Sequence, residues 1–306
     1  MRENVVRRES GLRLLVTGGT GFVGPAIVHR LRAEDHPVRC LVRDPGRTDA
    51  LGAWGFELAQ GDVTDPDSIR RAVEGCEVVV HLVAILQGKP EQFERIMVQG
   101  TRNVIDAAKA AGIRRFVLMS ALGTSEETKD LSLYFSSKWQ MEQMVKTSGL
   151  EHVIFRPSFV FGQGGGALKT FQRVVRLSPV IPVFGAGDQR LQPIWIENVA
   201  EYYGAAIDRP EAANRTFELG GPDIVTYEEL YDRIKRVLGK RRPKLHLPFA
   251  LMRVNAAILE ALPGPSPLTR DQLKMLSVDN VVSNADAQET FQLDLVPLDE
   301  QLRRAL

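Results

Sequence analysis

Residues 12–24 read LRLLVTGGTGFVG, an apolar run followed by a glycine-rich turn. A short, continuous apolar run is typical of a parallel strand that is buried on both faces. Glycines directly after such a strand let a phosphate approach the backbone closely, and the N-terminus of a following helix offers free N–H donors to it. The stretch therefore predicts a strand, a phosphate-binding loop and a helix, in that order.

The same alternation of strand-like and helix-like segments continues to residue 156. Further strands are expected at 37–42, 56–59, 77–83, 115–119 and 153–156, and helices at 22–32, 65–74, 91–111 and 133–147. Strands that alternate with helices of this kind form βαβ units around a parallel sheet. Because the crossovers are right-handed, we predict an α/β protein with a doubly wound parallel Rossmann sheet.

The second half is less regular and is interrupted by clusters of proline and glycine. We assign residues 1–162 to a Rossmann dinucleotide-binding domain. Residues 163–306 are expected to form a smaller, mostly helical substrate region, with segments near 183–205 and 216–221 returning to the Rossmann domain. An apolar segment at 248–262 is interpreted as a helix that lines the substrate pocket, and a helix that docks on a membrane surface or a partner is the alternative.

Composition and charge exclude several classes of protein. The 306 residues carry 39 Lys and Arg against 38 Asp and Glu, so no basic surface for a nucleic acid is expected. The two cysteines, Cys40 and Cys76, are far apart and lie in or beside apolar runs, which predicts buried, reduced thiols. The five histidines are scattered and predict no metal site.

No run of eighteen apolar residues occurs, so no segment is expected to span a membrane. The first eleven residues are polar and lack the apolar segment of a signal peptide. The expected localisation is therefore cytoplasmic, with peripheral association at the inner membrane face as the alternative. The oligomeric state is left open.

The end of the second expected strand indicates which dinucleotide is bound. An acidic residue at this place usually bonds the ribose 2′-hydroxyl of NAD, whereas an arginine accommodates the 2′-phosphate of NADP. Here Arg43 comes first and Asp44 follows it. Because a guanidinium matches a phosphate in charge and geometry, NADP(H) is the favoured cofactor and NAD(H) is the alternative.

Two motifs together carry a family resemblance. The loop TGGTGFVG, residues 17–24, reads as GxxGxxG and also contains GxGxxG. Further along, Tyr134 and Lys138 are four residues apart and therefore share one face of the expected helix. With matching segments at 155–162, 192–200 and 217–222, these motifs resemble the extended and atypical short-chain dehydrogenase/reductases, which belong with the NAD-dependent epimerases and dehydratases.

The resemblance implies a role for each motif. Tyr134 would be the acid/base that exchanges a proton with a substrate carbonyl or alcohol, and Lys138 would stabilise its phenolate and reach the nicotinamide ribose. Ser120 is the candidate for the hydroxyl that polarises the substrate. Besides Arg43, Tyr134 and Lys138, the cofactor contacts that we expect are Thr17, Gly18, Gly19, Thr20, Gly21, Phe22, Val23, Gly24, Asp62, Val63, Val83, Ala84, Pro157, Ser158 and Phe159.

Three positions depart from the family pattern. The place of the usual catalytic serine falls at residue 121 or 122, next to Ser120, and the place of the structural asparagine falls on Met97. Asn198 stands where an aspartate is usual. A second Tyr-x-x-x-Lys at 231–235 has the same spacing but lies late in the chain, and it is interpreted as an exposed helical pair.

The stretch at 267–280, with the intact Tyr–Lys pair, narrows the resemblance to the atypical subgroup of the NAD(P)H-binding accessory subunit of respiratory complex I. The first functional hypothesis is an oxidoreductase that moves hydride between the nicotinamide and an apolar carbonyl or quinone-like substrate. The alternative is a non-catalytic NAD(P)H-binding structural, assembly or redox-sensing protein of a respiratory complex, and a sugar-nucleotide epimerase is the third. The expected partners are a small apolar substrate and, in that context, a membrane surface or a respiratory complex.

Overall fold

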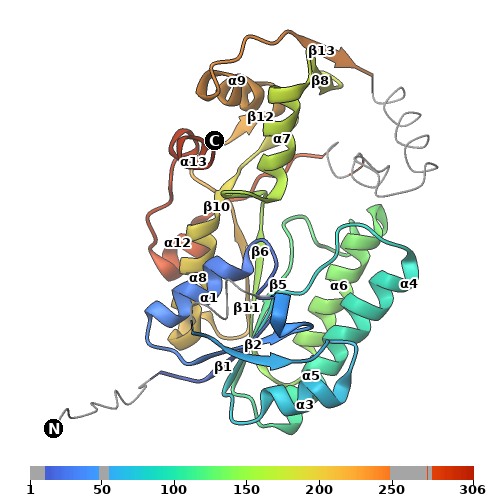
Figure 1. Ribbon diagram of the computed structural model, residues 1–306, viewed down its shortest axis with the longest axis vertical. Helices are drawn as coiled ribbons and strands as arrows, with labels where there is room; N and C mark the ends of the chain where they lie inside the picture. The colour runs from blue at the N-terminus through green and yellow to red at the C-terminus, as the bar shows by residue number, and fades with distance from the viewer. Residues whose placement is uncertain (1–10, 48–54, 249–273, 275–277) are drawn as a thin grey trace, which may run out of the picture.

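The computed structural model describes residues 11–47, 55–248, 274 and 278–306 (Figure 1). Its centre is a parallel sheet with the strand order β11-β6-β5-β4-β1-β2-β3. The strands are β1 (Leu14–Thr17), β2 (Val38–Val42), β3 (Glu57–Gln60), β4 (Val78–His81), β5 (Arg115–Met119), β6 (Glu151–Pro157) and β11 (Arg215–Leu219). Strand order reverses between β1 and β4, so the predicted doubly wound Rossmann sheet is confirmed.

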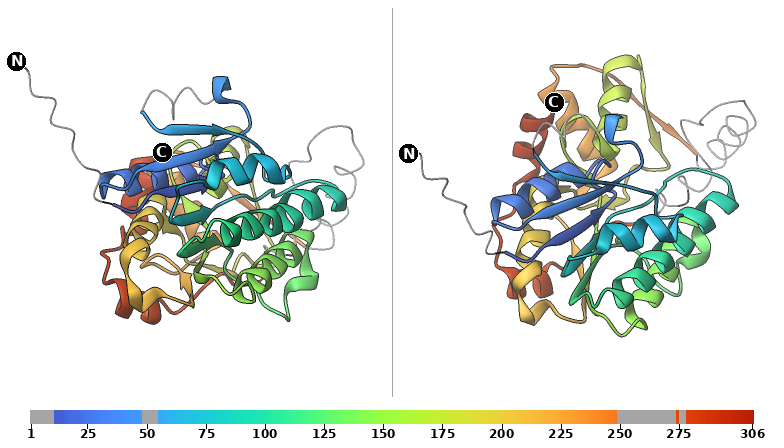
Figure 2. Two further views of the ribbon diagram at one scale, coloured as in Figure 1. Left: turned by 90° about the horizontal axis from the view of Figure 1, so that it is seen from below. Right: turned by 60° about the horizontal axis from the view of Figure 1, so that its bottom comes forward.

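Helices cover both faces of this sheet (Figure 2). On one face lie α1 (Gly24–Ala33) and α8 (Ile196–Asp208), packed side by side, and on the other lie α3 (Pro66–Val73), α5 (Gly100–Ala110) and α6 (Leu133–Lys146). Alternate residues of β1 enter the two apolar cores, Leu14 and Val16 with α1 and Leu15 with α3 and α5. Burial on both faces explains why the apolar run of this strand is continuous.

The starts of two helices follow local signals in the sequence. Asp65 caps α3, because its side chain accepts a hydrogen bond from the backbone N–H of Asp67, and Pro66 occupies the first turn. Thr226 and Glu229 form a capping box at the start of α9 (Tyr227–Val237). These signals lie within four residues of each other, so they can be recognised without knowledge of the fold.

The segment predicted as one helix at 91–111 has three parts. It begins with α4 (Pro90–Phe93), continues as the π-helical turn η2 (Glu94–Gln99) and ends with α5. A π-helical turn closes hydrogen bonds to the fifth residue and shifts the direction of the side chains that follow it. The predicted segment is therefore helical, but the π-helical turn that interrupts it was not predicted.

The second half adds small two-stranded ladders, further helices and a 3₁₀ turn at Pro210–Ala212, and the first half has 3₁₀ turns at Pro45–Arg47 and Lys129–Leu131. The ladders were not predicted, because strands of two to four residues carry no periodic signal. They pair β7 (Val160–Phe161) with β10 (Ile194–Trp195), β9 (Arg190–Leu191) with β12 (Val225–Thr226), and β8 (Ile181–Phe184) with β13 (Lys244–Leu247). The helices are α7 (Gly166–Leu177), α9, α12 (Ala285–Phe291) and α13 (Leu298–Ala305), and most of them enclose a third apolar core.

Asn198 joins α8 to the C-terminal segment. Its Nδ2 donates to the backbone carbonyl of Asp294 at 2.9 Å, and its Oδ1 accepts from the backbone N–H of Val296 at 2.9 Å. An aspartate could accept the second bond but could not donate the first. The amide at this position therefore has a structural reason in this chain.

Several remaining predictions concern burial and membranes. Cys40 and Cys76 are buried and unpaired, as predicted. Among the described residues, no helix combines the length and the apolar character needed to cross a membrane. The apolar segment predicted at 248–262 lies outside the described residues apart from Pro248, and so does most of the stretch at 267–280.

Candidate cofactor and catalytic site

A cleft of about 370 Å³ lies at the carboxyl ends of β1, β2, β3 and β4. This edge, next to the switch point between β1 and β4, is where ligands bind in open α/β sheets. The cleft brings together eight of the residues expected to contact a cofactor: Gly18, Thr20, Gly21, Arg43, Asp62, Val63, Val83 and Ala84. Arg95 and Ile96 of the η2 turn line the same cleft and were not predicted.

Glycine is required at different positions of the loop for different structural reasons. Gly18 has φ +79°, a left-handed conformation that favours glycine. A Cβ at Gly24 would lie 2.3 Å from the backbone oxygen of Gly19, so helix and loop touch through their backbones. At Gly21 a Cβ would meet only the Gly18 oxygen, at 3.2 Å. This backbone cradle leaves room for a pyrophosphate over the start of α1, which is the fit that a dinucleotide requires.

The remaining loop residues face inward or toward the second half of the chain. Thr17 and Gly19 are buried, and Val23 is half-buried beside the core under α1. The ring of Phe22 packs so closely on residues 165–166 that a Cβ at Gly165 would lie 2.2 Å from it. These residues position the loop, and Gly18 with the exposed residues Thr20 and Gly21 is the part that lines the cleft.

We expect two neighbouring substitutions to separate the fold of the loop from binding. Gly24→Ala forces a Cβ onto a backbone oxygen and should cost stability at the upper end of the roughly 1–3 kcal/mol typical of overpacking. Gly21→Ala should leave the melting temperature of the free protein nearly unchanged, but it should abolish most of the stabilisation that added NADPH provides. Thermal unfolding with and without NADPH measures both, and equal behaviour of the two variants would contradict the assignment.

Tyr134 and Lys138 lie on α6, as expected from their spacing. The Lys138 ammonium is 5.8 Å from the centre of the Tyr134 ring, and its Nζ donates to the backbone oxygen of Met119 at 2.5 Å. Burial lowers the pKa of Lys138 to about 7, against the opposing charge of Glu142, and burial raises the pKa of Tyr134. The hydroxyl of Tyr134 makes no hydrogen bond to the described residues, so it is available to a ligand.

Ser120 does not stand beside Tyr134 as a free hydroxyl. It is buried, its hydroxyl donates to the hydroxyl oxygen of Thr124 at 3.4 Å, and it contributes to lowering the pKa of Glu142. Glu142 is fully buried on α6, where both its oxygens accept from Arg156, at 2.8 and 2.7 Å, and one also meets Lys146 at 3.0 Å. The hydroxyl of Ser120 is thus engaged by this network, and substrate polarisation by it stays a prediction.

The carboxylate of Glu142 is the charged centre of that network. Burial would raise its pKa, but hydrogen bonds from Arg156 and Ser120 and the charge of Arg156 outweigh burial, and the pKa is lowered. A buried carboxylate with this many donors is stable as an anion. Glu142 therefore supplies the negative charge that favours protonation of Lys138, one helical turn away.

A buried hydrogen-bond chain beneath the loop was not predicted. The hydroxyl of Thr17 lies 2.6 Å from Nδ1 of His81, and the hydroxyl of Thr101 lies 3.0 Å from its Nε2. Since Thr101 donates to the carbonyl of Met97 at 2.5 Å, it accepts from Nε2–H, and Nδ1 accepts from Thr17. Burial, with the nearby charge of Lys138, lowers the pKa of His81 to about 3, so this histidine is neutral.

The three residues expected near the nicotinamide follow β6. Ser158 donates from its hydroxyl to the backbone oxygen of Gln192 at 2.5 Å, and the carbonyl of Phe159 accepts from the backbone N–H of Ile194. The carbonyl of Pro157 accepts from Leu122. The bonds of Ser158 and Phe159 therefore join the two halves of the chain, and the bond of Pro157 stays within the first half. The ring of Phe159 is half-buried.

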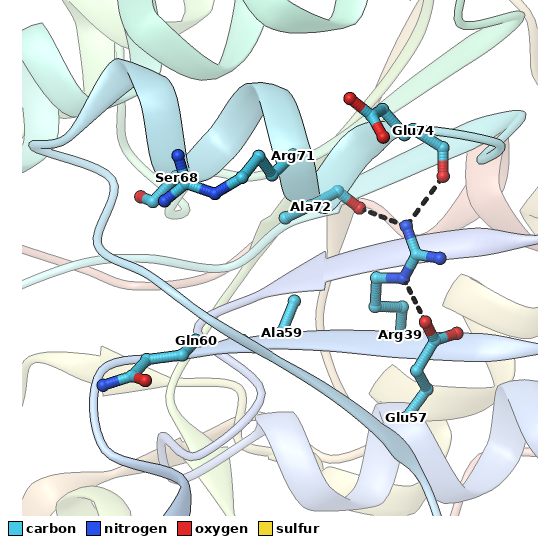
Figure 3. Close-up of a pocket in the computed structure, with 8 residues that line it drawn as sticks. All are labelled: Arg39, Glu57, Ala59, Gln60, Ser68, Arg71, Ala72 and Glu74. Carbon is cyan, nitrogen blue, oxygen red and sulfur yellow. Dashed lines mark hydrogen bonds and ion pairs between the residues drawn. The ribbon is translucent and has the colours of Figure 1, made fainter.

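A polar hollow and a second Tyr-x-x-x-Lys pair lie outside the candidate cofactor and catalytic site. The polar hollow between β3 and α3 is lined in part by Arg39, whose guanidinium bonds Glu57 and the backbone oxygens of Ala72 and Glu74 at 2.7 Å each (Figure 3). The pair at 231–235 is not exposed as predicted. Tyr231 is buried in the third core against Phe171, because the apolar face of α9 packs on α7.

Comparisons with known proteins agree with this geometry. The sequence model of a family described as NAD(P)H-binding matches residues 18–174. The chain is 28% identical to NADH dehydrogenase (ubiquinone) 1 alpha subcomplex subunit 9, mitochondrial, of Rattus norvegicus, over 90% of this chain and 74% of the rat protein. It is 30% identical to the ceramide reductase of Caulobacter vibrioides, over 80% of this chain and 77% of the reductase.

Among solved structures, an NADPH-dependent quinone oxidoreductase of Escherichia coli complexed with NADPH has the same fold. The TM-score is 0.76 at 22% identity, over 94% of this chain and 98% of the oxidoreductase. The predicted resemblance to the accessory subunit of complex I is confirmed, and the solved structures that share the fold include a short-chain dehydrogenase/reductase superfamily protein at 21% identity.

Proposed function

This chain belongs to the NAD(P)H-binding family, and we propose on that basis that it is an NADP(H)-dependent oxidoreductase of the short-chain dehydrogenase/reductase type. The observation that carries the proposal is the placement of Tyr134, with an unbonded hydroxyl, beside the buried Lys138 at the carboxyl edge of the sheet. The bound nicotinamide would supply or accept the hydride. Tyr134 would move the proton, and Lys138 would favour its phenolate.

Arg43 supports the preference for NADP(H). Its side chain is exposed in the cleft and makes no ion pair or hydrogen bond within the described residues. Asp44, the residue that would favour NAD(H), accepts a hydrogen bond from the backbone N–H of Gly46 at 3.0 Å. A free guanidinium at the end of β2 suits a 2′-phosphate.

We expect Arg43→Gln to weaken NADPH binding by about 10- to 100-fold, the equivalent of one lost charge-assisted hydrogen bond. Binding of NADH, which has no 2′-phosphate, should change less than twofold. Titration calorimetry with both nucleotides measures this difference, and NADH is its internal control. An equal loss for both would argue against Arg43 as the 2′-phosphate contact.

An apolar carbonyl or quinone-like compound is the proposed substrate class. The aromatic residues Phe135, Phe159 and Phe161 favour such a substrate by composition. Phe135 is buried, Phe161 is buried in the third core, and Phe159 is half-buried. Named relatives act on a quinone and on a ceramide. The test is steady-state oxidation of NADPH by the wild-type protein against a panel of quinones and aldehydes.

A second candidate is a nucleotide-binding protein without turnover, in the manner of a structural or assembly subunit. It is favoured by the burial of Ser120, whose hydroxyl bonds Thr124, and by Met97 at the usual place of the asparagine. It predicts thermal stabilisation by NADPH with no oxidation of the nucleotide by any member of the panel. An epimerase would need a polarising hydroxyl at position 121 or 122, where Ala121 and Leu122 offer none.

A further inference from the structure

The η2 turn presents an arginine to the cofactor cleft. Arg95 lines the same cleft as Arg43 and the glycine loop, although it is more than fifty residues from Arg43 along the chain. The turn is π-helical, and single π turns inside helices are frequent at functional sites because they change the direction of side chains. A regular α-helix over the same residues would present a different face.

The backbone beneath Arg95 is held against the cleft. Nδ2 of Asn103 donates to the carbonyl of Val63 at 2.9 Å, and a Cβ at Gly100 would lie 2.9 Å from the Val63 side chain. Thr101 holds the carbonyl of Met97 at 2.5 Å. Val63 itself lines the cleft. The turn is therefore anchored to the wall of the cleft before any ligand arrives, which reduces the entropy lost on binding.

No partner within the described residues explains why the Arg95 side chain lies in the cleft. It is exposed and makes no ion pair or hydrogen bond within the part of the chain that the structure describes, and the same holds for Arg43. Asp62 provides the one carboxylate among the described residues that line the cleft. Its Oδ1 accepts hydrogen bonds from the backbone N–H and the hydroxyl of Thr64, both at 2.8 Å. The two arginines outnumber this one carboxylate, so the described lining of the cleft carries a net positive charge that attracts an anion.

We infer that Arg95 is a second phosphate-binding residue for the dinucleotide, reaching the cleft from η2 while Arg43 reaches it from the end of β2. The inference rests on the proposed binding of NADP(H). A guanidinium forms paired, charge-assisted hydrogen bonds with phosphate oxygens. The phosphate is either the 2′-phosphate, shared with Arg43, or the pyrophosphate above the glycine loop. The alternative is that Arg95 is a solvated charge on the surface of the helix. This alternative predicts that substitution of Arg95 has no effect on nucleotide binding.

The test compares Arg95→Gln with Arg102→Gln. Arg102 is also exposed and lies on α5, one residue after Thr101, but it does not line the cleft. Dissociation constants for NADPH, NADH and ADP-ribose would be measured by calorimetry for both variants and the wild type. Thermal unfolding without nucleotide checks that the fold of each variant is unchanged.

Arg95→Gln should weaken NADPH binding by about tenfold, the equivalent of one charge-assisted hydrogen bond, and Arg102→Gln should change it less than twofold. A loss confined to NADPH identifies the 2′-phosphate, and an equal loss for all three ligands identifies the pyrophosphate. Affinities of Arg95→Gln within twofold of the wild type for all three would overturn the inference and leave the proposed function intact. A wild-type protein that binds none of them would overturn both.

Discussion

Replacement of Glu142 by alanine is expected to lower the free energy of unfolding by about 3–5 kcal/mol, the usual cost of removing one partner from a buried ion pair. The substitution leaves the guanidinium of Arg156 without the carboxylate that accepts two of its hydrogen bonds. Arg156 is mostly buried and would keep only Glu218, at 3.2 Å, as a partner. Urea denaturation of the wild type and the variant measures the difference.

Glu300 provides a matched control on the surface. It also accepts from two basic side chains, Arg303 at 2.8 Å and Arg304 at 3.0 Å, but it is more than a third exposed. Because solvent and salt screen exposed ion pairs, Glu300→Ala should be nearly neutral. Equal effects of the two substitutions on the free energy of unfolding would show that burial does not determine how much the Glu142 network stabilises the protein. Glu142→Gln, which keeps the shape and part of the hydrogen bonding, should lie between them.

Removal of the Tyr134 hydroxyl is expected to have the largest effect on turnover. Tyr134→Phe should reduce the rate of NADPH oxidation by about 10²- to 10⁴-fold, the range that general acid–base catalysis contributes. The hydroxyl has no hydrogen-bond partner among the described residues, so stability and the affinity for NADPH should remain close to those of the wild type. Steady-state kinetics on the best substrate of the panel, with calorimetry, separates the two effects.

Tyr231→Phe is the control for this experiment. The same Tyr-x-x-x-Lys spacing occurs there, but Tyr231 packs in the third core and Lys235 pairs with Asp232 at 2.8 Å. Its turnover should equal that of the wild type. Equal rates for wild type and Tyr134→Phe would remove Tyr134 from the chemistry and would favour the nucleotide-binding protein without turnover.

Resemblance and local pattern located the Tyr–Lys pair, but they did not determine its protonation. The pKa of Lys138 depends on burial and on Glu142, and the pKa of Tyr134 depends on burial. The packing of α6 on the sheet buries these side chains. A short stretch of sequence does not show which residues this packing will bury. The same packing decided that the buried hydroxyl of Ser120 bonds Thr124, which its position in the sequence did not reveal.

The stretch from Leu12 to Gly24 by itself determined the central unit of this protein. An apolar run, a glycine that accepts positive φ and a glycine without room for a Cβ are local properties, and they are sufficient for a strand, a phosphate loop and a helix. Only the tertiary structure decided that Arg95 shares a cleft with Arg43, and that His81 joins Thr17 to Thr101. The physical reason is that such contacts join residues far apart in the chain, and their position is set by strand order and helix register, which the sequence pattern does not state.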